Sequence, residues 1–390
     1  MLFGTRNKAR YEIQILSRGR WSQRENVAEQ EHAIAKARAL SQNDKTAEAI
    51  KVVQCTTEKS GAVSETEILL IDRPEAFRRA EFQVGAIDEV EPCATRDDLF
   101  KLDARRVMER QLRPYLGAEA LTPTEFLHIA TYHRQIEQQG SLVLAAAHTA
   151  ARVRSKADGS VIAETKEQIL NWGDEITEMA QDFAKNGKNL PKLSDTPFQD
   201  VAKAVNEAAP EGREGYWLTA AVCMDLTQHR AINDKLERLV ALLSSSDTSG
   251  VSILDKLFAD CILSPESLRE MLGQQVSLLA QIELCLGILR GQFTGKTAMG
   301  GNFLQVISKL VAAGLCPDTA GALRLHMIRA LASNTPLDSR EPDPNPERGK
   351  LMRLTAAISD DPMIRPDWPK FQAQIDRRER RLVNDLESYG

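Results

Sequence analysis

The stretch RGQFTGKTAMGGN (290–302) contains a GKT triplet at 295–297, which matches the end of a phosphate-binding loop. In such a loop, written GxxxxGK[ST], backbone N–H groups surround the phosphates and the dipole of the following helix favours negative charge. Here only three residues separate Gly291 from Gly295, and Arg290 stands where the first Gly belongs. The spacing therefore argues against a nucleotide site.

The segments on both sides of this triplet have helical periodicity. The preceding run (276–290) places six residues on one helical face: Leu278, Leu279, Ile282, Cys285, Leu286 and Leu289. The following run (303–311) is also periodic at helical spacing, and Asn302 is available as its N-cap. A phosphate-binding loop follows a strand, so we predict a Gly-rich connection between two helices, in which glycine allows the chain to reverse.

A metal site would need His and carboxylate residues at matched spacings on facing helices. Glu125 and His128 form ExxH, the spacing of helical di-iron proteins, which also need a second ExxH and two further carboxylates. The other match, Glu29 with His32, lies in a different predicted domain. Because Glu125 also completes a capping box with Thr122, we interpret it as structural.

Acid–base and nucleophilic chemistry have little support in the sequence. Asp225 and His229 lie four residues apart and could orient one another, although a simple helix contact is the commoner role of such a pair. There is no GxSxG motif. The six cysteines contain no CxxC pair, so we predict no structural zinc. We predict no catalytic residue, metal or cofactor, and an enzyme with a site invisible in the sequence stays an alternative.

The N-terminus is the basic part of this otherwise acidic chain. Six cationic residues and Glu12 give residues 1–24 a net charge of +5, which leaves -10 for the rest. Within them, Arg18, Arg20 and Arg24 flank Trp21. An aromatic residue among arginines on a sheet can stack a nucleic-acid base while the cations hold phosphates. We prefer the interpretation that Trp21 packs under the helix and that the arginines keep the edge strands soluble. A sheet with one helix also suits protein–protein contact.

The first ninety residues have the pattern of a small α+β domain. Alternating and β-branched runs predict four strands, and a helix with Ala33, Ile34, Ala37 and Leu40 on one face lies between the second and third. The predicted order is ββαββ, over residues 11–16, 21–26, 28–40, 49–57 and 65–72.

Helical signals dominate from Thr95 onward. We predict a helix that begins there and ends at Pro114, and a single helix over 122–139. Seven of the sixteen prolines lie in 336–369, and EPDPNPERG (341–349) is predicted to be an extended linker. The closing helix places Phe371, Ile375 and Leu382 on one apolar face. Its four arginines are expected in solvent or between subunits: Arg377, Arg378, Arg380 and Arg381.

Composition agrees with a multidomain helical protein. The chain has 390 residues, of which 42% are hydrophobic and 27% charged, and only 5% are aromatic. Plentiful Ala and Leu favour helices. We therefore predict a mostly α protein, with a small α+β (ββαββ) N-terminal domain (1–92), a large all-α helical domain (95–335), and a Pro-rich tail with a terminal helix (336–390).

The function we expect is a non-enzymatic adaptor or regulatory protein that acts through protein–protein contacts. Nucleic-acid binding by the basic N-terminal domain is the main alternative, and a homo-oligomer is left open. No apolar run is long enough to span a bilayer, so no membrane partner is expected. The basic N-terminus lacks a following apolar stretch, so we expect no signal peptide and a cytoplasmic location with reduced cysteines.

Overall fold

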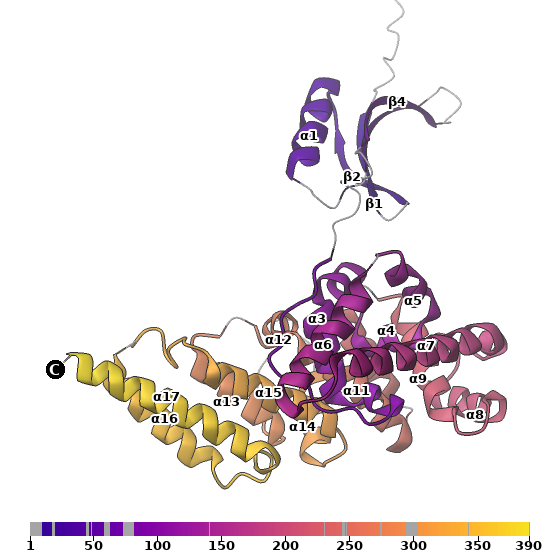
Figure 1. Cartoon of the computed structure of the whole chain (residues 1–390). Helices are drawn as coiled ribbons and strands as arrows, with labels where there is room; N and C mark the ends of the chain where they lie inside the picture. Colours follow the sequence, from indigo (N-terminus) through magenta and orange to yellow (C-terminus); the bar gives the residue numbers. More distant parts are fainter. Residues whose placement is uncertain are drawn as a thin grey trace, which may run out of the picture. The chain divides into compact units, whose positions relative to one another are not determined.

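The chain forms a small α+β unit and a large helical unit (Figure 1). The first comprises Met1–Phe82 and the second Gln83–Gly390. The predicted fold class, a small α+β domain followed by a large helical domain, is confirmed. The computed structural model describes residues 10–17, 20–43, 47, 49–57, 63–72, 82–139, 141–229, 231–243, 246, 248–273, 275–293, 303–341 and 343–389.

The N-terminal unit is an antiparallel sheet of four strands in the order β2-β1-β3-β4, with one helix. The buried core lies between the central strands and that helix, where Ile13, Ile50 and Val52 pack with Ala33 and Ala37. The small alanines let the helix lie close to the sheet. The order ββαββ is as predicted: β1 (Arg10–Ser17), β2 (Arg20–Val27), α1 (Gln30–Asn43), β3 (Ala49–Thr57) and β4 (Val63–Asp72).

The predicted interaction surface of this unit is only partly described. Arg18 lies outside the described residues. Arg20 and Trp21 belong to β2, where Trp21 is paired with Leu16 of β1, but their side chains lie outside the described part of the structure. Arg24 is exposed. The choice between protein and nucleic-acid contact at this surface therefore stays a prediction.

The helical unit consists of helices joined by short connections. Its elements are η1 (Arg96–Phe100), α3 (Leu102–Glu119), α4 (Pro123–His128), α5 (Ala130–Glu137), α6 (Leu142–Asp158), α7 (Ile162–Asn186), η2 (Gly187–Asn189), α8 (Phe198–Ala208), α9 (Glu214–Leu226), α10 (Ile232–Leu243), α11 (Thr248–Leu263), α12 (Pro265–Leu272), α13 (Leu278–Leu289), α14 (Phe303–Ala312), α15 (Pro317–Ala332), α16 (Pro344–Ile358), η3 (Arg365–Asp367) and α17 (Trp368–Tyr389).

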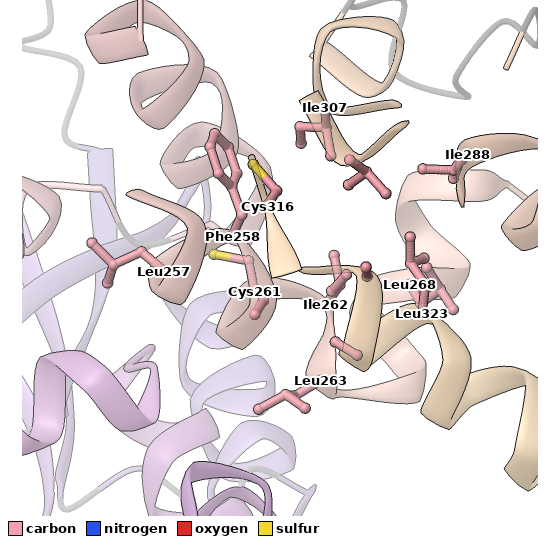
Figure 2. Close-up of a cluster of buried hydrophobic side chains, with 14 of the residues drawn as sticks. Leu257, Phe258, Cys261, Ile262, Leu263, Leu268, Ile288, Ile307, Cys316 and Leu323 are labelled. Carbon is pink, nitrogen blue, oxygen red and sulfur yellow. The ribbon is translucent and has the colours of Figure 1, made fainter. Parts of the chain in front are cut away.

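Helix α11 forms the centre of the main core. Its side chains from Leu257 to Leu263 are buried on every side, the pattern of a helix inside a large domain. Figure 2 shows Phe258 and Cys261 of this helix near Cys316, at the start of α15. The same core continues into α16 and α17, so the C-terminal helices complete it.

Helix α3 contains Pro114 in its interior, and the prediction that this proline ends the helix is wrong. Proline lacks an N–H, so the carbonyl of Arg110, four residues earlier, loses its helical donor. The segment before the helix lies over this turn. There the Gly85 amide donates to the Gln111 carbonyl at 2.9 Å, and a Cβ at Gly85 would lie 2.0 Å from the Arg110 oxygen.

The single helix predicted over 122–139 is two helices, α4 and α5, so that prediction is also wrong. Ile129 between them has an extended backbone, with φ -117° and ψ 107°. The predicted capping box of Thr122 and Glu125 is confirmed. Residues 121–130 are all buried, and the break brings the His128 ring within 4.4 Å of the Tyr216 ring, measured between centroids. Tertiary packing thus overrides the helical periodicity.

The Pro-rich tail also differs from its prediction. Helix α16 begins at Pro344, inside the stretch predicted as an extended linker, because Asp343 caps its first turn and Pro is well suited to that position. The predicted apolar face of α17 is buried, but Arg378 is buried with it, and the expectation that this arginine lies in solvent is wrong. Its guanidinium donates to Glu347 and to carbonyls near the end of α15.

Candidate functional site

The phosphate-loop-like triplet at 295–297 lies outside the described residues, as does Asn302. The elements that flank it are α13 and α14, so the prediction of helices on both sides is confirmed. Gly291, two residues after the end of α13, has φ +73°, which is the left-handed conformation that glycine accepts at little cost. The segment that contains the triplet therefore follows a helix rather than a strand.

The ExxH pair of Glu125 and His128 is part of the buried structure. Glu125 forms an ion pair with Lys235 of α10, whose Nζ lies 2.6 Å from both carboxylate oxygens. The Nδ1 of His128 lies 2.7 Å from the Thr124 carbonyl oxygen. Within the described part of the chain, no group of three or more His, Cys, Asp or Glu residues could hold a metal ion.

Asp225 and His229 do not form the pair that their spacing suggests. Helix α9 ends at Leu226, so His229 lies beyond it. Asp225 instead accepts two hydrogen bonds from the Arg238 guanidinium, at 2.6 Å from Nε and 3.1 Å from the second nitrogen. This arrangement is a structural contact between α9 and α10.

A buried ionic cluster around Arg105 was not predicted from the sequence. The Arg105 guanidinium pairs with Asp260 of α11 and Asp318 of α15, and also donates to the Thr124 hydroxyl at 3.2 Å. Burial raises the pKa of Asp260 to about 6, although the positive charge of Arg105 opposes this. The partners lie far apart in sequence, so no local spacing could reveal them. Because Arg105 and Asp260 are buried, this cluster is a structural contact between helices.

The feature best suited to binding is a mostly apolar pocket of about 410 Å³ between α3, α5, α6 and α7. Small residues on facing helices leave this volume open. Ala146, Ala147 and Ala150 line it from α6, and a Cβ at Gly173 of α7 would meet nothing within 4 Å. Its larger apolar lining residues include Val107, Met108, Leu112, Ile136, Ile169 and Ile176. Pockets of this size and polarity are typical ligand sites.

The mouth of the pocket combines exposed apolar side chains with acidic residues. Val143 and Leu144 of α6 line it and are 38% and 46% exposed. Five charged residues line the pocket: Arg154 is basic, and the other four are the acidic residues Glu91, Asp103, Glu137 and Asp174. The pocket thus has apolar walls and a rim with net negative charge.

The inner wall is uncharged at neutral pH. The His133 ring stacks on Phe126 with 5.2 Å between centroids, and its Nδ1 lies 2.9 Å from the Thr177 hydroxyl. Burial lowers the pKa of His133 to about 4 and raises that of the half-buried Cys93 thiol. A neutral imidazole and a neutral thiol suit the binding of an apolar group better than nucleophilic chemistry.

No family model matches the chain, and neither the curated proteins nor the solved structures gave a match. Among the described residues, no single helix has both the length and the apolar character needed to cross a bilayer. Only α14 and α15 taken together meet those requirements, and they are bent by 102° relative to each other.

Proposed function

We propose that this protein is a non-enzymatic adaptor or regulatory protein, whose helical unit receives an apolar side chain of a protein partner. The observation that carries the proposal is the apolar pocket of about 410 Å³, which continues outward to the exposed Val143 and Leu144. An apolar anchor that fills a deep pocket is the usual centre of a protein interface. A cytoplasmic location remains part of this proposal.

The electrostatic character of the pocket supports binding rather than catalysis. Its titratable inner residues, His133 and Cys93, have pKa values shifted toward the neutral forms by burial. The acidic residues lie at the rim, where Asp174 and Glu137 are exposed to solvent. An enzyme with an undetected site stays the weaker candidate.

The experiment that tests the proposal fills the pocket. Gly173→Leu adds a side chain where there is room, so the fold should survive while the pocket closes. The matched control is Gly349→Leu in α16, which also has no atom within 4 Å of its Cβ and lies away from the pocket. Circular dichroism and thermal unfolding verify that both variants fold.

The readout is the fluorescence of N-phenyl-1-naphthylamine, a neutral apolar probe, together with thiol labelling of Cys93. We expect the probe to bind the unmodified protein and the Gly349→Leu variant, and to slow labelling of Cys93, the cysteine that lines the pocket. Gly173→Leu should lose both effects. Equal probe binding by the two variants would contradict the proposal.

Nucleic-acid binding by the N-terminal unit is the second candidate, supported by the net charge of +5 on residues 1–24. It predicts RNA or DNA binding that weakens steeply with salt. Replacing Arg18, Arg20 and Arg24 together should flatten that salt dependence by roughly one unit of slope per lost phosphate contact. Weak binding without any dependence on these arginines would exclude it.

A further inference from the structure

We infer that the pocket receives an amphipathic helix of a partner protein, with a bulky apolar anchor flanked by Lys or Arg residues. This inference rests on the proposed function and specifies the chemistry of the partner. Three features of the pocket support this inference: the negative charge of its rim, the contacts that already occupy the guanidinium of its one arginine, and the apolar surface at its mouth.

The acidic rim is built from four separate segments of the chain. Glu91 precedes α3, Asp103 lies in α3, Glu137 ends α5 and Asp174 lies in α7. Within the described residues, Glu91, Glu137 and Asp174 form no ion pair. The nearest cation to Asp103 is Arg106, at 3.9 Å. Cations of a partner would therefore meet three rim carboxylates that form no ion pair with the described residues of this chain.

The single basic residue of the lining does not neutralise this rim. Arg154 directs its Nε to Asp158 at 3.2 Å, and another guanidinium nitrogen to the Cys93 carbonyl at 3.1 Å. These contacts hold the guanidinium along α6 and toward the segment before α3. The rim as a whole repels phosphates, so nucleic acids and anionic lipids are unsuitable occupants of this surface.

The apolar surface beside the mouth favours a helix over a small molecule. Val143 and Leu144 are consecutive on α6 and remain 38% and 46% exposed. A compound that fills only the inner part of the pocket would leave their outer surfaces in water. A helix that inserts one side chain carries further apolar residues three and four positions away, and these would cover both.

The experiment uses two labelled 18-residue helical peptides and the full chain. Both peptides have a Leu face with one central Trp; one carries Lys on its polar positions and the other Glu. We expect the Lys peptide to bind, measured by fluorescence anisotropy at physiological ionic strength, and to displace N-phenyl-1-naphthylamine. The Glu peptide should bind at least about tenfold more weakly. Gly173→Leu should abolish binding of the Lys peptide, and Gly349→Leu should not.

The contribution of the acidic rim is tested by neutralising two of its carboxylates, with a control that neutralises two acids outside the pocket. The double variant Glu137→Gln/Asp174→Asn should weaken the Lys peptide by about threefold to tenfold, since exposed charge pairs contribute little individually. The matched control is Glu167→Gln/Glu178→Gln, which removes two exposed acids of α7 that do not line the pocket. The control should leave the affinity unchanged, and thermal unfolding verifies that both variants fold.

The outcomes separate the inference from the proposed function. Equal affinity for the two peptides, or stronger displacement of the probe by dodecyltrimethylammonium than by the Lys peptide, overturns the helix inference. In either case the proposed function still stands if the probe binds the unmodified protein and Gly173→Leu prevents that binding. If neither the probe nor the Lys peptide binds the unmodified chain, the proposed function itself fails.

Discussion

The ammonium group of Lys235 and the carboxylate of Glu125 form an ion pair that is closed to solvent, with side chains 1% and 0% exposed. Lys235 Nζ lies 2.6 Å from both carboxylate oxygens and 2.6 Å from the Ala120 carbonyl oxygen, so all three of its hydrogens have acceptors. Glu125 also accepts the Thr122 amide at 2.8 Å. The pair joins α4 to α10 and satisfies the buried charges completely.

Removal of the lysine alone should be costly. In Lys235→Met the Glu125 carboxylate stays buried without its cation, and we expect a loss of about 3–5 kcal/mol in the free energy of unfolding, measured with urea. The double variant Glu125→Gln/Lys235→Met should recover most of this loss, because Gln keeps the capping bond without a charge. A single variant that costs less than about 1 kcal/mol would show that the pair is accessible to water.

Gly85 should tolerate no side chain. A Cβ there would lie 2.0 Å from the Arg110 carbonyl oxygen, so Gly85→Ala should push the segment off α3 and cost about 1–3 kcal/mol. The matched control is Gly117→Ala in α3, because a Cβ at Gly117 would meet nothing within 4 Å. We expect that control to stabilise the protein by about 0.5–1 kcal/mol. Equal effects in urea unfolding would refute the close approach.

Two buried histidines should make the protein sensitive to acid. Burial lowers the pKa of His128 to about 3 and that of His133 to about 4, while both titrate near 6.5 in the unfolded chain. As pH falls from 6.5 toward 4, these two residues therefore bind up to two more protons in the unfolded chain than in the folded one. The stability that these residues contribute is complete above pH 6.5 and is lost as pH falls toward 4.

Asp260 opposes this trend over part of the range. Its pKa is raised to about 6, so between about pH 4 and 6 the folded chain holds one proton that the unfolded chain has lost. For these three residues together, the net difference of one proton gives a slope of about 1.4 kcal/mol per pH unit, with stability falling toward acid. Urea unfolding at pH 7, 6 and 5 measures it. The slope should become smaller in His133→Gln, and no change in stability over this range would contradict the prediction.

The helical unit should fold alone only when it includes its C-terminal helices. Residues 83–390 should give a strongly helical spectrum and one cooperative thermal transition. A fragment that ends at residue 335 should not, because Leu351, Phe371 and Ile375 complete the main core and Arg378 bonds to carbonyls at the end of α15. Cooperative unfolding of the shorter fragment would support the domain limits predicted from sequence alone.

The sequence predicts local features of this chain well. Alternation in β1 and β-branched runs in β3 and β4 place the strands within two residues of where they lie. The capping box at Thr122 also signals its helix start correctly. These successes share a cause, since each pattern reports contacts between residues that are close in sequence.

The failures involve partners that are distant in sequence. Nothing near Pro114 shows that Gly85 will lie against the turn that this proline opens. The Arg378 contact with Glu347 likewise crosses from α17 to α16. The candidate pocket has the same origin, because Gly173 and the alanines of α6 create space only when four helices meet. Its one local signal is the run of small residues in LAAAHTAA (144–151).

The open space beside Gly173 should make this position a target in directed evolution for thermal stability. Unfilled apolar volume between helices means that the residues around it lose van der Waals contacts. A glycine inside a helix lowers stability by a further amount of about 0.5–1 kcal/mol relative to alanine. A selection for heat resistance alone would thus enrich larger residues at this position and along the small face of α6. If the pocket binds a partner as proposed, stability gained in this way would reduce that binding, so the enriched positions would outline the proposed docking surface without any knowledge of the partner.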